Sequence, residues 1–150
     1  MAFPGTRLVA EDADRYRYPN LFSFEAKMSI LSSLLSIVSG GTSGATVTPA
    51  QVREQMALPV PERPTLIDVR TPGEWKQGRI AGAKHIDVSA SDFDRKVADL
   101  PREGKYLLYC QSGGRSGMAL SRMKSKGFTD VNHLGGGIST WRAAGFPVAK

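Results

Sequence analysis

The stretch KYLLYCQSGGRS, residues 105–116, leads from an apolar run into the start of a helical pattern. Its first half, 105–110, is the most strongly apolar strand-length segment of the chain and predicts a buried, central strand. The only cysteine of the chain, Cys110, stands where this segment ends. In open α/β sheets, ligands bind beyond the carboxyl ends of the strands. The position of Cys110 therefore predicts a ligand site around its thiol.

Strands and helices alternate on both sides of this stretch, from residue 48 to the end of the chain. The segments that predict strands are 65–69, 83–88, 105–110 and 130–134. The segments that predict helices are 48–57, 71–78, 91–100, 115–127 and 138–145. Thr48 as N-cap and Pro49 at the first helical position predict the start of the first helix. In the segment 115–127, Met118, Leu120 and Met123 are expected to face partly inward. Several of the strands are continuously apolar, which is typical of a parallel sheet covered by helices on both faces. We therefore predict one α/β domain over residues 46–150.

Residues 1–45 differ in composition and are predicted to be an N-terminal extension. Residues 1–27 are polar without periodicity, which favours a poorly ordered segment. Residues 28–39 place apolar side chains on one arc of a short helix and serines on the opposite arc. Residues 40–45 have the composition of a flexible linker. We expect the amphipathic helix to dock on the domain, on a protein partner or second subunit, or on a membrane surface, although its polar face lacks the Lys and Arg that favour membranes.

The composition excludes several classes of protein. The chain has 150 residues with one cysteine and two histidines, so an internal disulfide is excluded and no metal site is expected. The net charge is +6, but no run of Lys and Arg is interleaved with aromatic residues, so we expect no nucleic-acid binding. No apolar run approaches the ~20 residues that a transmembrane helix needs.

The expected compartment follows from the free thiol. A free cysteine favours a reducing compartment, and we interpret the chain as cytoplasmic. Export from an internal start at Met28 is the alternative, since Lys27 precedes an apolar segment and Gly44 and Ala45 suit a cleavage site.

The residues after Cys110 have the composition of an anion-binding turn. Gly113 and Gly114 allow backbone dihedrals that other residues resist, and the helix that starts near Arg115 directs its N-terminal N–H groups to the same place. These donors, together with Arg115, are expected to lower the thiol pKa below its ordinary value of about 8.5. The alternative is an inert buried cysteine, because free Cys packs as a small hydrophobe. The glycines, the arginine and the helix start together favour the reactive thiolate.

Several groups of residues, taken in order, resemble the rhodanese domain. They are IDVRTPGEW (67–75), GRIAGAKHI (78–86), YLLYCQSGGRS (106–116) and LGGGISTW (134–141), the last followed by GFPV (145–148). The resemblance covers residues 46–150 and leaves the extension unexplained. It implies a five-stranded parallel sheet flanked by helices, and sulfurtransferase activity through a persulfide on the cysteine.

By position, the resemblance implies that Cys110 is the nucleophile. It also implies a substrate-binding cradle, acting mainly through backbone N–H groups, that consists of Gln111, Ser112, Gly113, Gly114, Arg115 and Ser116. Asp68 and Arg70 end a predicted strand and are expected to support the site. A structural role is favoured, in which Asp68 pairs with the loop or Arg70 pairs with Glu74, and the alternative is that the two residues line the cleft.

Two positions depart from the family pattern, which usually has His where this chain has Arg79 and Pro where it has Ala81. Arg79 adds a cation that we expect near the rim of the cleft, and we expect neither departure to abolish the chemistry. The glycines at 135–137 lack the spacing of a dinucleotide fingerprint and predict a tight turn. Packed side chains are expected at Trp75, His85, His133 and Trp141.

The expected reaction moves sulfane sulfur from thiosulfate or a related anionic donor to a thiol or cyanide acceptor, without a cofactor. The alternative is a sulfur-relay or sensing module that acts with a protein partner and turns over little by itself. A cysteine phosphatase is not favoured, because four residues separate Cys110 from Arg115, one fewer than in phosphatases that resemble this fold. The shorter loop suits a single terminal sulfur atom.

Overall fold

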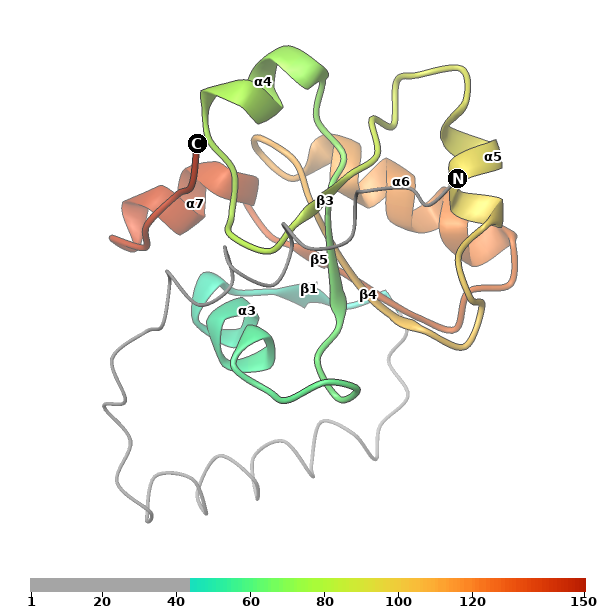
Figure 1. The fold of residues 1–150 in the computed structure, drawn as a ribbon, viewed down its shortest axis with the longest axis horizontal. Coiled ribbons are helices and arrows are strands. Elements are labelled where there is room, and N and C mark those ends of the chain that lie inside the picture. The colour runs from blue at the N-terminus through green and yellow to red at the C-terminus, as the bar shows by residue number, and fades with distance from the viewer. Residues whose placement is uncertain (1–43) are drawn as a thin grey trace, which may run out of the picture. The chain divides into compact units, whose positions relative to one another are not determined.

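The computed structural model describes residues 44–150 (Figure 1). The poorly ordered segment 1–27, the amphipathic helix 28–39 and most of the linker 40–45 lie outside the described residues. The docking expected of that helix and the alternative start at Met28 therefore stay predictions. Within the described part, no helix has the length and hydropathy to cross a membrane.

Residues 44–150 contain five parallel strands that form one sheet in the order β1-β5-β4-β2-β3. Their bounds are β1 Thr46–Val47, β2 Thr65–Asp68, β3 Lys84–His85, β4 Lys105–Tyr109 and β5 Asp130–Leu134. The most apolar strand, β4, occupies the centre of the sheet, as predicted. Leu108 of β4 lies opposite Ile67 of β2 on one side and His133 of β5 on the other. The carboxyl ends of these three strands therefore reach the same edge of the sheet.

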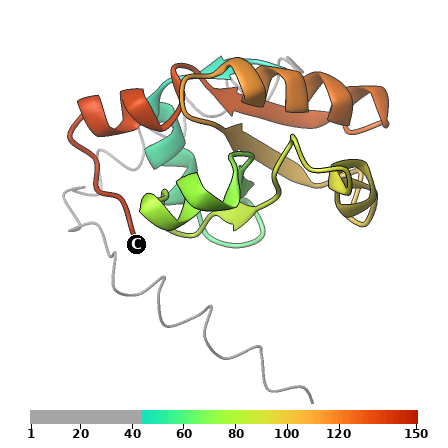
Figure 2. The ribbon, with the colours of Figure 1, turned by 90° about the horizontal axis from the view of Figure 1, so that it is seen from above.

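Helices of the described part pack against both faces of this sheet. Their bounds are α3 Pro49–Met56, α4 Pro72–Gln77, α5 Phe93–Ala98, α6 Gly114–Ser125 and α7 Gly137–Ala143. Side chains of α5 and α6 share one buried cluster with Leu108, and side chains of α3 and α7 share another with Leu107. Both views show α6 alongside β5 (Figures 1 and 2). The predicted parallel α/β sheet with helices on its faces is confirmed.

The alternation of side chains along β4 determines which face of the sheet carries the thiol. Successive strand residues point to opposite faces of a sheet. Tyr106, Leu108 and Cys110 belong to the cluster under α5 and α6, whereas Leu107 and Tyr109 belong to the cluster under α3 and α7. The cysteine therefore lies on the face of α6, the helix that begins immediately after it.

Details of the predicted elements differ from the structure in three places. The short β1 was not predicted from the residue pattern, because two residues give no apolar run. The outermost strand, β3, covers only 84–85 of the predicted 83–88, since it pairs with β2 alone. Met118 was expected partly inward, but it is 54% exposed because the buried face of α6 consists of Ser116, Ala119, Leu120 and Met123.

The start of the described chain is hydrogen-bonded to β5. The backbone N–H of Ala45 donates to Asn132 Oδ1 at 3.0 Å, and its carbonyl accepts from the His133 N–H at 3.1 Å. The Gly135 N–H donates to the Val47 carbonyl at 2.9 Å. Ala45, which the sequence places in the linker, thus takes part in the hydrogen bonding of the sheet.

A chain that begins at Gly44 should fold by itself, because the whole sheet and both buried clusters lie within residues 44–150. We expect it to unfold cooperatively on heating, with a midpoint within about 5 °C of the full chain. A matched chain that begins at Pro49 lacks β1 and should melt at a lower temperature. Non-cooperative melting of the Gly44 chain would contradict an independent domain.

Candidate active site

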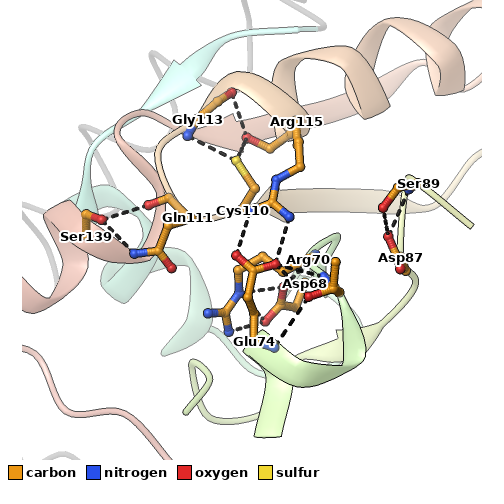
Figure 3. Close-up of polar contacts among 12 residues, drawn as sticks. Asp68, Arg70, Glu74, Asp87, Ser89, Cys110, Gln111, Gly113, Arg115 and Ser139 are labelled. Carbon is orange, nitrogen blue, oxygen red and sulfur yellow. Dashed lines mark hydrogen bonds and ion pairs between the residues drawn. The ribbon is translucent and has the colours of Figure 1, made fainter. Parts of the chain in front are cut away.

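Cys110 follows β4 directly and opens the cysteine loop, defined here as residues 110–116 (Figure 3). The chain turns at Gly113, the N-cap of α6, where φ is +103°, a conformation that favours glycine. This turn directs the Gly113 N–H back to the Cys110 Sγ, at an N···S distance of 3.0 Å. Because Cys110 is only 1% exposed, the loop holds a buried sulfur against a backbone donor.

The loop shifts the thiol toward its anionic form. Burial by itself raises the pKa of Cys110, because it disfavours the charged thiolate. Hydrogen bonds from the backbone and hydroxyl of Ser116, and from the backbone of Gly113 and Ser112, lower the pKa by more. The thiol pKa therefore lies below its ordinary value, in the direction that the sequence predicts.

The guanidinium of Arg115 forms a two-point ion pair with Glu74 of α4 (Figure 3). Nη1 donates to Glu74 Oε2 at 2.8 Å, and Nη2 donates to Oε1 at 2.7 Å. The same carboxylate accepts from the backbone N–H and hydroxyl of Thr71, the N-cap of α4. The hydrogen bond from Arg115 is the main cause that lowers the pKa of Glu74 from 4.5 to about 2. Arg115 thus joins the start of α6 to the start of α4.

Asp68 and Arg70 form a buried ion pair at the end of β2. Arg70 Nη2 lies 2.6 Å from Asp68 Oδ2, and the residues are 1% and 0% exposed. Arg70 Nη2 also donates to the Gly78 carbonyl at 2.7 Å. Among the described residues, neither the expected pair of Arg70 with Glu74 nor a bond from Asp68 to the loop is present, because each carboxylate takes another cation. The two residues support the strand end by pairing with each other.

The first residues of α7 bind the carbonyls of the cysteine loop. The Ile138 N–H donates to the Cys110 carbonyl at 2.9 Å, and the Ser139 N–H donates to the Gln111 carbonyl at 3.2 Å. The Gln111 side chain points toward α7 and donates to Ser139 Oγ at 3.0 Å (Figure 3). Gly137 has φ +63°, and a Cβ there would collide with the Cys110 carbonyl oxygen. The predicted glycine turn therefore also supports the loop.

The remaining loop residues differ in how tightly they are held. Ser112 and Gly114 are exposed, whereas Ser116 is buried with its Oγ 3.6 Å from the Cys110 Sγ. Gly114 does not have a positive φ, and a Cβ there would meet no atom within 4 Å. Of the two loop glycines, only Gly113 is required by the backbone conformation.

Three residues that hold the loop were not identified from the sequence as its supports: Glu74, Gly137 and Ser139. The run of three glycines before α7 was the available indication, since close backbone approach is one reason for a glycine. Nothing in the sequence distinguishes Ser139 from other surface serines. The sequence suggests Glu74 as a partner of Arg70, whereas in the structure it pairs with Arg115.

Arg79, which departs from the family pattern, and three of the residues that were expected to be structural, Trp75, His85 and Trp141, are packed. Arg79, expected as a cation at the rim, lies over the Trp75 ring at 4.6 Å from the centroid, and its backbone pairs with Ala149. Trp75 in turn stacks on His85 at 5.0 Å. Trp141 is fully buried, as predicted.

The chemistry available at this site is that of one activated sulfur. The described residues hold no group of three or more His, Cys, Asp or Glu side chains that suits a metal ion. Backbone donors that are fixed before reaction stabilise negative charge without having to reorient. The arrangement can therefore hold an anionic sulfur, or a short sulfur chain, at the end of β4.

Comparisons with known proteins point to one family. The family model of the rhodanese-like domain matches residues 48–144. The probable adenylyltransferase/sulfurtransferase MoeZ of Mycobacterium tuberculosis is 41% identical over 98 residues, which are 65% of this chain and 24% of MoeZ. The thiosulfate sulfurtransferase GlpE of Pseudomonas putida is 37% identical over 83 residues, covering 55% of this chain and 73% of GlpE. This chain thus spans about a quarter of MoeZ.

A solved structure agrees with these sequence comparisons. The crystal structure of a rhodanese-related protein from Thermoplasma volcanium matches this chain with a TM-score of 0.61 and 30% sequence identity. The match covers 70% of this chain and 97% of that protein. The likeness therefore includes nearly the whole of a rhodanese-related domain.

Gly137→Ala should destabilise the fold by at least about 2 kcal/mol, because alanine is strained at this φ and its Cβ meets the Cys110 carbonyl. Gly114→Ala is the matched control in the same site and should change stability by only about 0.5 kcal/mol, since its backbone and surroundings accept a methyl group. Urea unfolding of both variants measures the difference. Equal stability of the two variants would show that α7 does not confine the loop.

Glu74→Gln should cost more stability near neutral pH than in acid. The folded-state pKa of about 2 lies below 4.5, so the carboxylate contributes stability that is present above pH 4.5 and is lost as the pH falls toward 2. The difference in the free energy of unfolding between Glu74→Gln and the wild type should therefore become smaller as the pH is lowered from neutral to about 3. A gap that stays constant over this range would contradict the ion pair as its source.

Proposed function

This chain belongs to the family of rhodanese-like domains, and on that premise we propose that it is a sulfurtransferase that carries sulfane sulfur on Cys110. The observation that supports this proposal most strongly is the hydrogen bond from the Gly113 N–H to the Sγ of a buried, single cysteine. Relatives named as sulfurtransferases support the same activity. The proposed donor is thiosulfate or a related anionic sulfane compound.

In the first half-reaction, the Cys110 thiolate attacks the outer sulfur of thiosulfate. A new S–S bond forms to Sγ, the S–S bond of the donor breaks, and its electron pair leaves on sulfite. The product is a cysteine persulfide whose terminal sulfur carries the negative charge. Backbone donors from Ser112, Gly113 and Ser116 surround the sulfur, and such charge-assisted hydrogen bonds are stronger than neutral ones.

In the second half-reaction, a thiol or cyanide acceptor attacks the terminal sulfur of the persulfide. The S–S bond to Sγ breaks and its electron pair returns to Cys110 as the thiolate. Two half-reactions through a covalent intermediate give ping-pong kinetics. The chemistry uses only the sulfur and its hydrogen-bond donors, so the proposal includes no metal and no cofactor.

A second candidate function is a sulfur relay to a protein partner. The observation that favours it is the match to MoeZ, in which the aligned residues form only 24% of a longer protein named as an adenylyltransferase/sulfurtransferase. In that case the persulfide forms but small acceptors remove its sulfur slowly. Turnover of the full chain with thiosulfate and cyanide favours the first function, and a persulfide without turnover favours the relay.

Cys110→Ser should fold like the wild type and lose sulfur transfer to the background rate, because a serine hydroxyl is scarcely ionised near neutral pH and cannot carry sulfane sulfur. Thiocyanate formation from thiosulfate and cyanide measures the activity, and mass spectrometry detects one added sulfur atom on the wild-type chain. The same preparation assayed with an aryl phosphate is the control for phosphatase activity. Turnover by the serine variant, or phosphate release without persulfide, would overturn the proposal.

A further inference from the structure

The hydroxyl of Ser116 lies within hydrogen-bond reach of three groups. Its Oγ is 3.6 Å from the Cys110 Sγ, 2.9 Å from the His133 Nδ1 and 3.1 Å from the Gly113 carbonyl oxygen. A hydroxyl has one proton to donate and two lone pairs to accept with. Whether Ser116 donates to the sulfur or accepts from it therefore depends on what His133 does.

The imidazole of His133 extends this contact from the buried sulfur to the edge strand. His133 lies in β5 between β4 and β1, in register with Leu108 on one side and Thr46 on the other. Its second ring nitrogen, Nε2, lies 3.2 Å from Thr46 Oγ1 in an exposed position. Each ring nitrogen thus faces a hydroxyl group: Nδ1 faces that of Ser116 beside the sulfur, and Nε2 faces that of Thr46 at the surface.

We propose that Ser116 and His133 form a proton relay that takes up the proton of the Cys110 thiol, with His133 as a positioning residue that acts through Ser116. The proposal rests on the proposed function, in which Cys110 reacts as a thiolate. The Cys110 S–H proton moves to Ser116 Oγ while the Ser116 hydroxyl proton moves to His133 Nδ1. The sulfur gains the negative charge and the imidazole gains the positive charge, so the total charge is unchanged.

After this transfer every hydrogen bond of the relay points toward the sulfur. The imidazolium Nδ1–H donates to Ser116 Oγ, and the Ser116 O–H donates to the thiolate. Burial lowers the pKa of His133, so the ring is a neutral acceptor near neutral pH until the thiolate forms beside it. The relay therefore adds a side-chain donor to the backbone donors of the loop.

Charged groups on the elements around His133 define the background against which it titrates. His133 is part of β5, and β1, β4 and α6 pack against this strand. The charged side chains on these elements are Lys105, Arg115, Arg122, Lys124 and Asp130. Arg115 and Arg122 are engaged by Glu74 and Asp94. Within residues 44–150, the ring nitrogens have hydroxyl groups at hydrogen-bond distance. The thiolate, which lies beyond the Ser116 hydroxyl, is the anion that favours the imidazolium in this proposal.

The first test measures the thiol pKa from the pH dependence of iodoacetamide alkylation, which reports on one site because the chain has one cysteine. We expect Ser116→Ala and His133→Asn in the full chain to raise this pKa by about one unit. The matched control is His85→Asn, since His85 Nε2 lies against the Arg70 carbonyl at 2.6 Å and not against the sulfur path. It should leave the thiol pKa in place. An unshifted pKa in His133→Asn would overturn the proposal, because Ser116→Ala alone removes a hydrogen-bond donor to the sulfur whether or not His133 takes part.

The second test leaves the relay residues intact and so does not depend on the folding of their variants. Thermodynamic coupling is reciprocal, so removal of the thiol must change the titration of His133. NMR titration of the histidines should show the His133 pKa lower by about one unit in Cys110→Ser than in the wild type. Identical His133 titrations would contradict the relay.

These measurements separate the relay from the function on which it rests. Neither readout requires turnover, so they remain valid if the chain forms no persulfide, and a missing persulfide contradicts the sulfurtransferase alone. If persulfide forms while both titrations stay unchanged, the sulfurtransferase stands and the relay falls.

Discussion

A negative charge on a sulfur that is almost shielded from water requires hydrogen-bond donors, and this requirement governs the structure around Cys110. Burial alone would keep the thiol protonated. The left-handed turn at Gly113 returns its N–H to the sulfur, and the start of α6 brings further N–H groups to the same point. The central position of β4 fixes where these donors meet, because the strand is held on both sides.

Donors stabilise an anion best when they cannot reorient, and three contacts restrain the cysteine loop. The N–H groups at the start of α7 bind the carbonyls of Cys110 and Gln111. The ion pair of Arg115 with Glu74 joins α6 to α4. Preorganised donors of this kind lower the barrier of a reaction in which charge moves between sulfur atoms. The buried cysteine is thus the reacting group in our proposal, and the surrounding elements hold its environment.

The parts of this arrangement that could be predicted from sequence are local. Apolar runs predict the longer strands, because burial on both faces demands continuous apolar residues. Thr48 and Pro49 predict a helix start, because a cap and a first-turn proline act within one turn of the helix. The position of Cys110 after an apolar run predicts a thiol at a strand end, and the structure places it there against the Gly113 N–H. The partners of Arg115, Arg70 and Ser116 could not be predicted, because ion pairs and hydrogen bonds between distant segments depend on how those segments pack. The two-residue β1 was missed from the pattern since it gains its pairing from β5 alone.

The most direct measurement is the pKa of the Cys110 thiol in the native chain and in the same chain unfolded in urea, followed by thiolate absorbance. The chain has one cysteine, so each titration reports on that residue. We predict a native pKa below the unfolded one, because the loop donors outweigh the cost of burial. A native pKa equal to or above the unfolded value would contradict the claim that the loop holds an anionic sulfur.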